Sequence, residues 1–229
     1  MAQSFTDFAE ITDYLIVGSH PRDAVDIRKL YYGNHVRAIE NLQESGERLR
    51  GDIDAITAQC ALLENRIWYL RQPLLDLMTN FEWLLVTELV DIGCQIPDED
   101  PKSVRTLLPQ AVGILDKAIT EKVKEHGDTV YLHCCEGRGR SPSVAAAYLY
   151  WFTNDTLDAA CNLVREKRNP STPYRDAILG ATYDILERIK GTHNFEESPS
   201  ETFSDILSRQ KDEIKRYLSK KLPAVGNAP

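Results

Sequence analysis

The chain has 229 residues, of which 42% are hydrophobic and 27% charged, and its formal net charge at pH 7 is −8. This composition is typical of a globular protein with one good-sized core, and no apolar run approaches the roughly 20 residues of a membrane-spanning helix. The acidic balance argues against a nucleic-acid partner, because such a surface needs clustered positive charge. An anionic substrate would therefore need a local positive pocket.

The five cysteines are irregularly spaced, and no pair has the C-x-x-C spacing of a zinc or thioredoxin site. An odd count of this kind favours a reducing compartment, and we expect no metal and no other cofactor. Cys60, Cys94 and Cys161 are interpreted as small buried apolar residues. The first residues have the pattern of neither a signal peptide nor a transit peptide, which predicts a cytoplasmic protein if the chain is complete.

The first part of the chain alternates short strands with helices. Apolar runs bounded by turn residues predict strands over residues 12–18, 36–42 and 67–70. Apolar periodicity predicts helices over residues 22–31 and 52–63. Residues 74–97 are apolar with few turn signals, so periodicity does not decide between helix and strand there. The acidic run 98–100, bracketed by prolines, is expected to be a loop.

The second part adds one central strand and several helices. Thr129–His133 is a β-branched and aromatic run, and an apolar helix is expected to follow it over residues 142–152. Amphipathic spacing predicts the other helices, over residues 102–124, 156–168, 175–190 and 201–221. The last of these should turn its basic residues to solvent: Lys211, Lys215, Arg216, Lys220 and Lys221. Helices alternating with strands predict an α/β fold.

The informative segment lies between the central strand and the apolar helix, and reads His133-Cys134-Cys135-Glu136-Gly137-Arg138-Gly139-Arg140-Ser141-Pro142. Gly137 and Gly139 permit positive φ and leave room for a ligand. Loop N–H groups followed by a helix N-terminus form an anion-binding nest. Ser141 is expected to cap the helix, with Pro142 at its first position.

The residue types around this loop predict nucleophilic chemistry on phosphate. The field that binds a phosphate dianion also stabilises a thiolate at Cys134. Arg140, with five residues between it and Cys134, can grip two phosphoryl oxygens with its planar fork. Ser141 could donate a hydrogen bond to the departing sulfur, and His133 could hold the loop through its ring N–H.

The pattern His-Cys-x5-Arg-Ser resembles the signature of the dual-specificity, cysteine-dependent phosphatase superfamily. The resemblance implies a single α/β domain with a central, mostly parallel, twisted sheet flanked by helices. It implies a metal-free hydrolysis of phosphate monoesters through a cysteinyl-phosphate intermediate. It also implies a general acid, an aspartate on a loop about thirty residues before the cysteine.

Longer stretches of the chain resemble the plant glucan phosphatases, which dephosphorylate starch glucans in plastids. The matching segments are residues 11–19, 41–43, 98–101, 180–184 and 195–206. The resemblance implies a catalytic domain over residues 1–192, with an insertion at about 74–95, and a C-terminal helical extension over 193–229 that packs on it. It implies a phosphorylated glucan as substrate and a plastid location.

Two alignments place the general acid differently. Asp98 lies 36 residues before Cys134, near the family's usual separation, whereas Asp76 lies 58 residues before it. We expect Asp98 to be the acid, with Asp100 next and Asp76 third.

Other features leave the substrate open. Arg138 stands where phosphoinositide phosphatases of the superfamily often have a basic residue, and Glu136 either offsets its charge or pairs with it. The aromatic residues that glucan phosphatases carry near positions 47–51 are absent. A phosphoprotein or phosphoinositide phosphatase is therefore the alternative, and a silent phosphate-binding scaffold is the third hypothesis. We expect a monomer without nucleic-acid partner or integral membrane segment.

Overall fold

The computed structural model describes residues 7–43, 68–70, 101–123, 127–192 and 206–221. These residues contain a five-stranded sheet in the order β1-β2-β5-β3-β4, formed by Phe8–Thr12 (β1), Leu15–Gly18 (β2), Val36–Asn41 (β3), Trp68–Leu70 (β4) and Thr129–His133 (β5). Only β1 is antiparallel to its neighbour; the other three pairings are parallel. The predicted α/β fold with a mostly parallel sheet is confirmed, and β1 is a strand that the sequence did not predict.

Strand β5 occupies the centre of the sheet between β2 and β3. Val130 and Leu132 face one apolar cluster and Tyr131 faces another, so both sides of the strand are buried. A strand buried on both faces needs an almost continuous apolar run, which the segment TVYLH provides.

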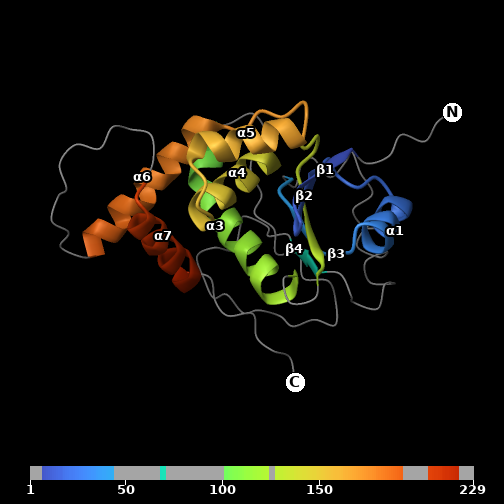
Figure 1. The fold of residues 1–229 in the computed structure, drawn as a ribbon, viewed down its shortest axis with the longest axis horizontal. Helices are drawn as coiled ribbons and strands as arrows, with labels where there is room; N and C mark the ends of the chain where they lie inside the picture. Colours follow the sequence, from blue (N-terminus) through green and yellow to red (C-terminus); the bar gives the residue numbers. More distant parts are fainter. Residues whose placement is uncertain (1–6, 44–67, 71–100, 124–126, 193–205, 222–229) are drawn as a thin grey trace, which may run out of the picture.

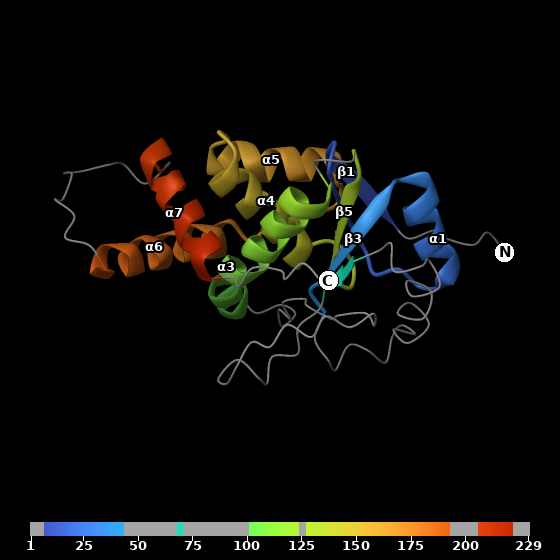
Figure 2. The same ribbon diagram turned by 90° about the horizontal axis from the view of Figure 1, so that it is seen from below.

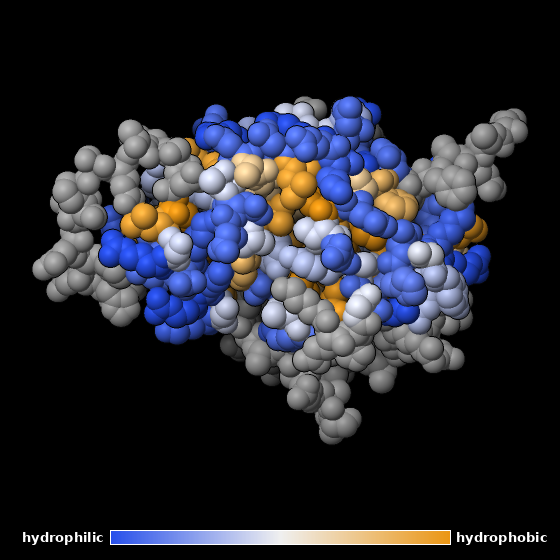
Figure 3. Space-filling view, viewed as in Figure 1, coloured by the Kyte–Doolittle hydropathy of each residue, from blue (hydrophilic) through white to orange (hydrophobic). Residues whose placement is uncertain are grey.

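Helices cover both faces of the sheet (Figures 1 and 2). Of the helices that the structure describes, α1 lies by itself on one face, and the others lie on the opposite face or beyond it. Their bounds are Ala24–Gly33 (α1), Pro101–Ala118 (α3), Arg140–Phe152 (α4), Leu157–Lys167 (α5), Arg175–Thr192 (α6) and Ser208–Lys221 (α7), with a π-helical turn η2 over Ile119–Val123 after α3. The outward sides of α5 and α7 are mainly hydrophilic (Figure 3). None of the helices in these ranges combines the length and apolar character needed to cross a bilayer.

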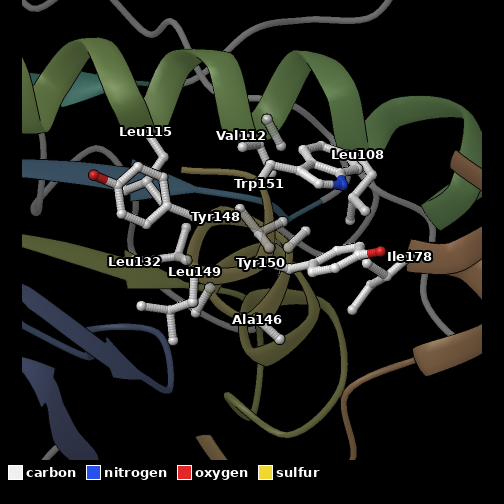
Figure 4. Packing of buried hydrophobic residues seen from close by; sticks show 14 of the residues in the cluster. Leu108, Val112, Leu115, Leu132, Ala146, Tyr148, Leu149, Tyr150, Trp151 and Ile178 are labelled. Carbon is white, nitrogen blue, oxygen red and sulfur yellow. The ribbon is translucent and has the colours of Figure 1, made fainter. Parts of the chain in front are cut away.

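The main core forms where α4 is enclosed by its neighbours. Leu108, Val112 and Leu115 of α3 lie over the aromatic side chains of α4 (Figure 4). The indole of Trp151 is fully buried and donates a hydrogen bond of 2.9 Å to the Thr182 hydroxyl on α6. Because α4 contacts the sheet and several helices at once, it is apolar nearly all round, as its sequence predicted.

Some element predictions need correction. The helix expected over residues 142–152 begins earlier, at Arg140. Lys211 does not face solvent: it is 8% exposed, and its ammonium donates to the carbonyl oxygens of Thr153 and Asp155 at 3.1 and 2.6 Å. The long lysine side chain reaches the chain that follows α4, a contact that helical periodicity cannot reveal.

Other predictions fall outside the described residues: the helix over 52–63, the segment 74–97, the acidic loop 98–100, Cys60 and Cys94. Cys161 on α5 is buried, as predicted, and burial raises the pKa of its thiol. Buried thiols of this kind act as small apolar groups.

Candidate active site

The loop between β5 and α4 lies at the carboxyl edge of the parallel strands, where α/β sheets commonly bind ligands. Two neighbouring strand ends reach it. The backbone N–H of His20, after β2, donates to the Cys135 carbonyl at 3.0 Å, and that of Leu42, after β3, donates to the His133 carbonyl at 2.9 Å. The segment from His133 to Ser141 is thus held from both sides.

The carbonyl oxygens of this loop point away from its centre. Those of residues 135–139 accept hydrogen bonds from groups outside the loop, and the donors are His20, Arg168, Thr172 and Ser143. In addition, Nδ1 of His133 lies 3.2 Å from the Cys134 carbonyl. Since a trans peptide unit sets its C=O and N–H on opposite sides, the loop N–H groups are turned inward as an anion nest.

The two loop glycines serve different purposes. Gly137 has φ +68°, the left-handed conformation that glycine adopts without strain, and a Cβ there would collide with the Gly18 backbone. Gly139 has φ −116°, so its small size matters instead: a Cβ would lie 2.8 Å from the Tyr174 hydroxyl. The expectation of positive φ therefore holds only at Gly137.

Cys134 lies at the centre of the nest and is 3% exposed. Its Sγ accepts a hydrogen bond from the Gly137 N–H at 3.3 Å and lies 3.4 Å from the Ser141 hydroxyl. The positive end of the α4 dipole is directed at the same loop. These donors favour negative charge on the sulfur and on any anion bound beside it.

Arg140 and Ser141 are the first two residues of α4, and both are buried. The expectation that Ser141 caps the helix is wrong: the N-cap is Gly139, without a side-chain cap, and Pro142 is the third helical residue. The Ser143 hydroxyl donates a hydrogen bond to the Gly139 carbonyl, and the Ser141 hydroxyl lies beside the sulfur.

The rim of the loop carries opposite charges. Arg138 and Glu136 are both exposed and form an ion pair, with Nη1 3.4 Å from Oε2. The suggested pairing of these two side chains is therefore present, and the carboxylate offsets the positive charge of Arg138. Cys135 points elsewhere: its Sγ accepts a hydrogen bond from the Gln43 amide at 3.2 Å.

Several further residues shape the site, and two of them, Arg168 and Thr172, were not singled out from the sequence. Arg168 follows α5, and its position suggested only a basic side chain at a helix end. Thr172 and Tyr174 lie on the next connection and approach the loop at Arg138 and Gly139. Tyr131 lies beneath it, with its hydroxyl donating to the Ser19 carbonyl at 2.6 Å, and burial raises the pKa of its phenol.

All three aspartates considered for the general acid, Asp98, Asp100 and Asp76, lie outside the described residues. Their assignment stays a prediction from the family resemblance and from the spacing to Cys134.

Comparison with known proteins agrees with this geometry. Residues 72–178 match the family described as "Dual specificity phosphatase, catalytic domain". The phosphoglucan phosphatase DSP4, amyloplastic, of Castanea sativa is 36% identical over 103 residues, covering 45% of this chain and 26% of that protein. The phosphoglucan phosphatase LSF1, chloroplastic, of Arabidopsis thaliana is 28% identical over 197 residues, covering 86% of this chain and 28% of that protein. The chain thus spans only about a quarter of the length of these curated relatives.

Among solved structures, PTPMT1 in complex with PI(5)P matches with a TM-score of 0.55 at 17% identity, covering 79% of this chain and 97% of that one. This likeness concerns the fold. The chain therefore contains a segment, residues 72–178, that matches the dual-specificity phosphatase catalytic domain, and it is similar in sequence to plant phosphoglucan phosphatases.

Proposed function

We propose that this chain hydrolyses phosphate monoesters through a cysteinyl-phosphate intermediate on Cys134. The observation that carries the proposal is the surroundings of the sulfur. The sulfur accepts a hydrogen bond from the Gly137 N–H and lies beside the Ser141 hydroxyl, within a loop whose N–H groups point inward. A buried sulfur with these donors at a helix N-terminus is suited to act as a nucleophilic thiolate.

The reaction has two steps. The Cys134 thiolate attacks phosphorus, a P–S bond forms, the P–O bond to the alcohol breaks, and Asp98 gives its proton to the departing oxygen. Arg140 and the loop N–H groups hold the remaining phosphoryl oxygens. A water molecule then gives a proton to Asp98 and attacks phosphorus, which breaks the P–S bond and releases phosphate and the thiolate. Ser141 donates to the sulfur as it leaves.

Replacement of the nucleophile tests this function. Cys134→Ser should lower kcat for p-nitrophenyl phosphate by at least about 10³-fold, because the serine hydroxyl is a far weaker nucleophile. Cys161→Ala, which changes a cysteine on α5 instead, should keep its activity. Full turnover by Cys134→Ser would disprove the mechanism, and a wild-type chain that binds phosphate without hydrolysing any ester would favour a scaffold.

For the substrate we propose a phosphorylated glucan and, with it, a plastid location. The support comes from the names of the two curated relatives, one amyloplastic and one chloroplastic, both phosphoglucan phosphatases. The Glu136–Arg138 pair adds support, because a rim with cancelling charges suits the neutral hydroxyls of a sugar better than a second phosphate. A fluorescent fusion of the full-length protein that stays in the cytoplasm would contradict the location.

The alternative substrate is a phosphoprotein or phosphoinositide, and the exposed guanidinium of Arg138 is the feature that favours it. Phosphate release from amylopectin, phosphopeptides and inositol lipids, measured side by side, separates the three classes. We expect amylopectin to be the best substrate. Faster release from an inositol lipid or a phosphopeptide would establish the alternative.

We further propose that residues 193–229 form an extension packed on a catalytic domain of residues 1–192, and that the chain is a monomer. The support for packing is that Ile214 and Leu218 of α7 are buried in the same apolar cluster as α4. Size-exclusion chromatography with light scattering at several concentrations tests the monomer.

A further inference from the structure

Arg168 is a buried cation that the two-step reaction does not use. It follows the last residue of α5, and its side chain is 3% exposed. Its Nε donates to the Gly137 carbonyl at 2.7 Å, and its Nη2 donates to the Glu136 carbonyl at 3.0 Å. The same Nη2 lies 3.2 Å from Oδ2 of Asp7, whose side chain is 74% exposed.

The two carbonyls that Arg168 holds belong to the peptide units that carry the N–H groups of Gly137 and Arg138. Each trans peptide unit is planar, with its C=O and N–H pointing in opposite directions. Holding these oxygens outward therefore turns both N–H groups toward the pocket. The Gly137 N–H shows this result, since it donates to Cys134 Sγ at 3.3 Å.

The shape of this contact suits arginine rather than lysine. The guanidinium donates along two directions from one rigid plane, and it does so to two successive carbonyls here. The contact is also close, because a Cβ on Gly137 would lie 2.7 Å from Nη2 of Arg168. A lysine ammonium would keep the charge but could not reproduce both bonds in this plane.

We propose that Arg168 is a positioning residue that holds the anion-binding loop in its receptive conformation, and that its ion pair with Asp7 joins the segment before β1 to that loop. The ligand class is a tetrahedral oxyanion, which the reaction presents as a phosphate ester. The proposal rests on the proposed function for its link to turnover, although anion binding tests it separately.

The experiment compares Arg168→Lys and Arg168→Gln with Arg165→Gln in the full chain. Arg165 is an exposed arginine on α5 whose substitution changes the net charge equally without touching the loop. The probe is sodium tungstate, a non-covalent oxyanion, titrated by calorimetry, and the second readout is kcat and KM for p-nitrophenyl phosphate. Thermal melting of each variant shows whether it is folded.

We expect both Arg168 variants to bind tungstate at least about tenfold more weakly, the loss expected when charge-assisted hydrogen bonds that order a loop are removed. Arg165→Gln should stay within about twofold of wild type, since an exposed charge outside the site contributes little. Among folded variants, kcat/KM should fall in the same order as tungstate affinity. Wild-type tungstate affinity in Arg168→Lys would overturn the proposal.

Two additions keep the outcome decisive. If neither Arg168 variant folds, Asp7→Asn is the deciding variant, because it changes an exposed side chain that orients the guanidinium. A loss of about two- to threefold in tungstate affinity would support the proposal, and an unchanged affinity would overturn it. Tungstate binding by a wild-type chain that hydrolyses no ester would contradict the proposed function while still reporting on Arg168. Normal hydrolysis with unchanged binding in Arg168→Lys would contradict only the present inference.

Discussion

The Ser141 hydroxyl lies beside the Cys134 sulfur, with 3.4 Å between Oγ and Sγ. In the first step of the proposed reaction the sulfur attacks and gives up negative charge, whereas in the second step it leaves as a thiolate and regains that charge. A hydroxyl that donates to the sulfur therefore assists mainly the second step.

Ser141→Ala should slow hydrolysis of the cysteinyl-phosphate by about tenfold, the factor that corresponds to one hydrogen bond of about 1.4 kcal/mol. Rapid-quench kinetics with p-nitrophenyl phosphate should then show a burst of p-nitrophenol close to one equivalent. Ser141→Thr keeps the hydroxyl and should restore steady turnover. Equal slowing of the burst and of the steady phase would show that Ser141 does not act on the leaving sulfur.

At the scale of elements, α7 docks on the end of α4 through polar and apolar contacts together. The ammonium of Lys211 donates to two carbonyl oxygens beyond α4, and the backbone N–H of Ile206 donates to the Tyr150 hydroxyl at 3.2 Å. Ile214 is fully buried beside them. A buried ammonium with carbonyl acceptors is stabilising only while those bonds exist.

Lys211→Met should keep the apolar stem but lose both hydrogen bonds, and we expect a loss of about 1–3 kcal/mol in the free energy of unfolding. Lys215→Met on the same helix is the matched control, since Lys215 is partly exposed and only pairs with Asp212 at 3.7 Å. Urea denaturation of both variants measures the difference. Equal stability of the two would mean that Lys211 does not secure α7.

At the scale of the whole molecule, one buried carboxyl links stability to pH. Glu40 on β3 is completely buried, and its carboxyl oxygens have no hydrogen-bond partner within the described ranges. Burial raises the pKa of Glu40 well above its usual value. The unfolded chain therefore releases this proton at lower pH than the folded protein, so stability falls as pH rises from the ordinary glutamate pKa toward the raised one.

Between pH 5 and 7.5 the free energy of unfolding should fall by up to about 1.4 kcal/mol per pH unit because of Glu40, for as long as the folded carboxyl keeps its proton. Glu40→Leu should flatten this slope and raise the melting temperature at pH 7.5. Glu10→Gln, at an exposed position on β1, should leave the slope unchanged. Thermal melts across this pH range measure the slope of stability against pH. An unchanged slope in Glu40→Leu would contradict the conclusion that Glu40 causes it.

The strand–loop–helix arrangement around the candidate site could be predicted from the sequence, whereas the long-range contacts to that loop could not. His133 to Ser141 form a contiguous segment whose strand, glycines and apolar helix all act over a few residues, so the loop could be recognised. Arg168 could not, because its partners at Gly137 and Glu136 lie 31 and 32 residues away in the chain. Lys211, 58 residues from Thr153, was misplaced on a solvated face for the same reason.

By itself, the sequence determined the alternation of strands and helices and the central place of Thr129–His133, and it predicted the chemistry of Cys134 and Arg140. These depend on short-range periodicity and on residue type. Only the tertiary structure decided that the loop carbonyls turn outward, that Ser141 lies beside the sulfur instead of capping α4, and that Arg168 supports Gly137. The physical reason is that a hydrogen bond between distant segments exists only once the fold has brought them together, and it leaves no periodic trace in the chain.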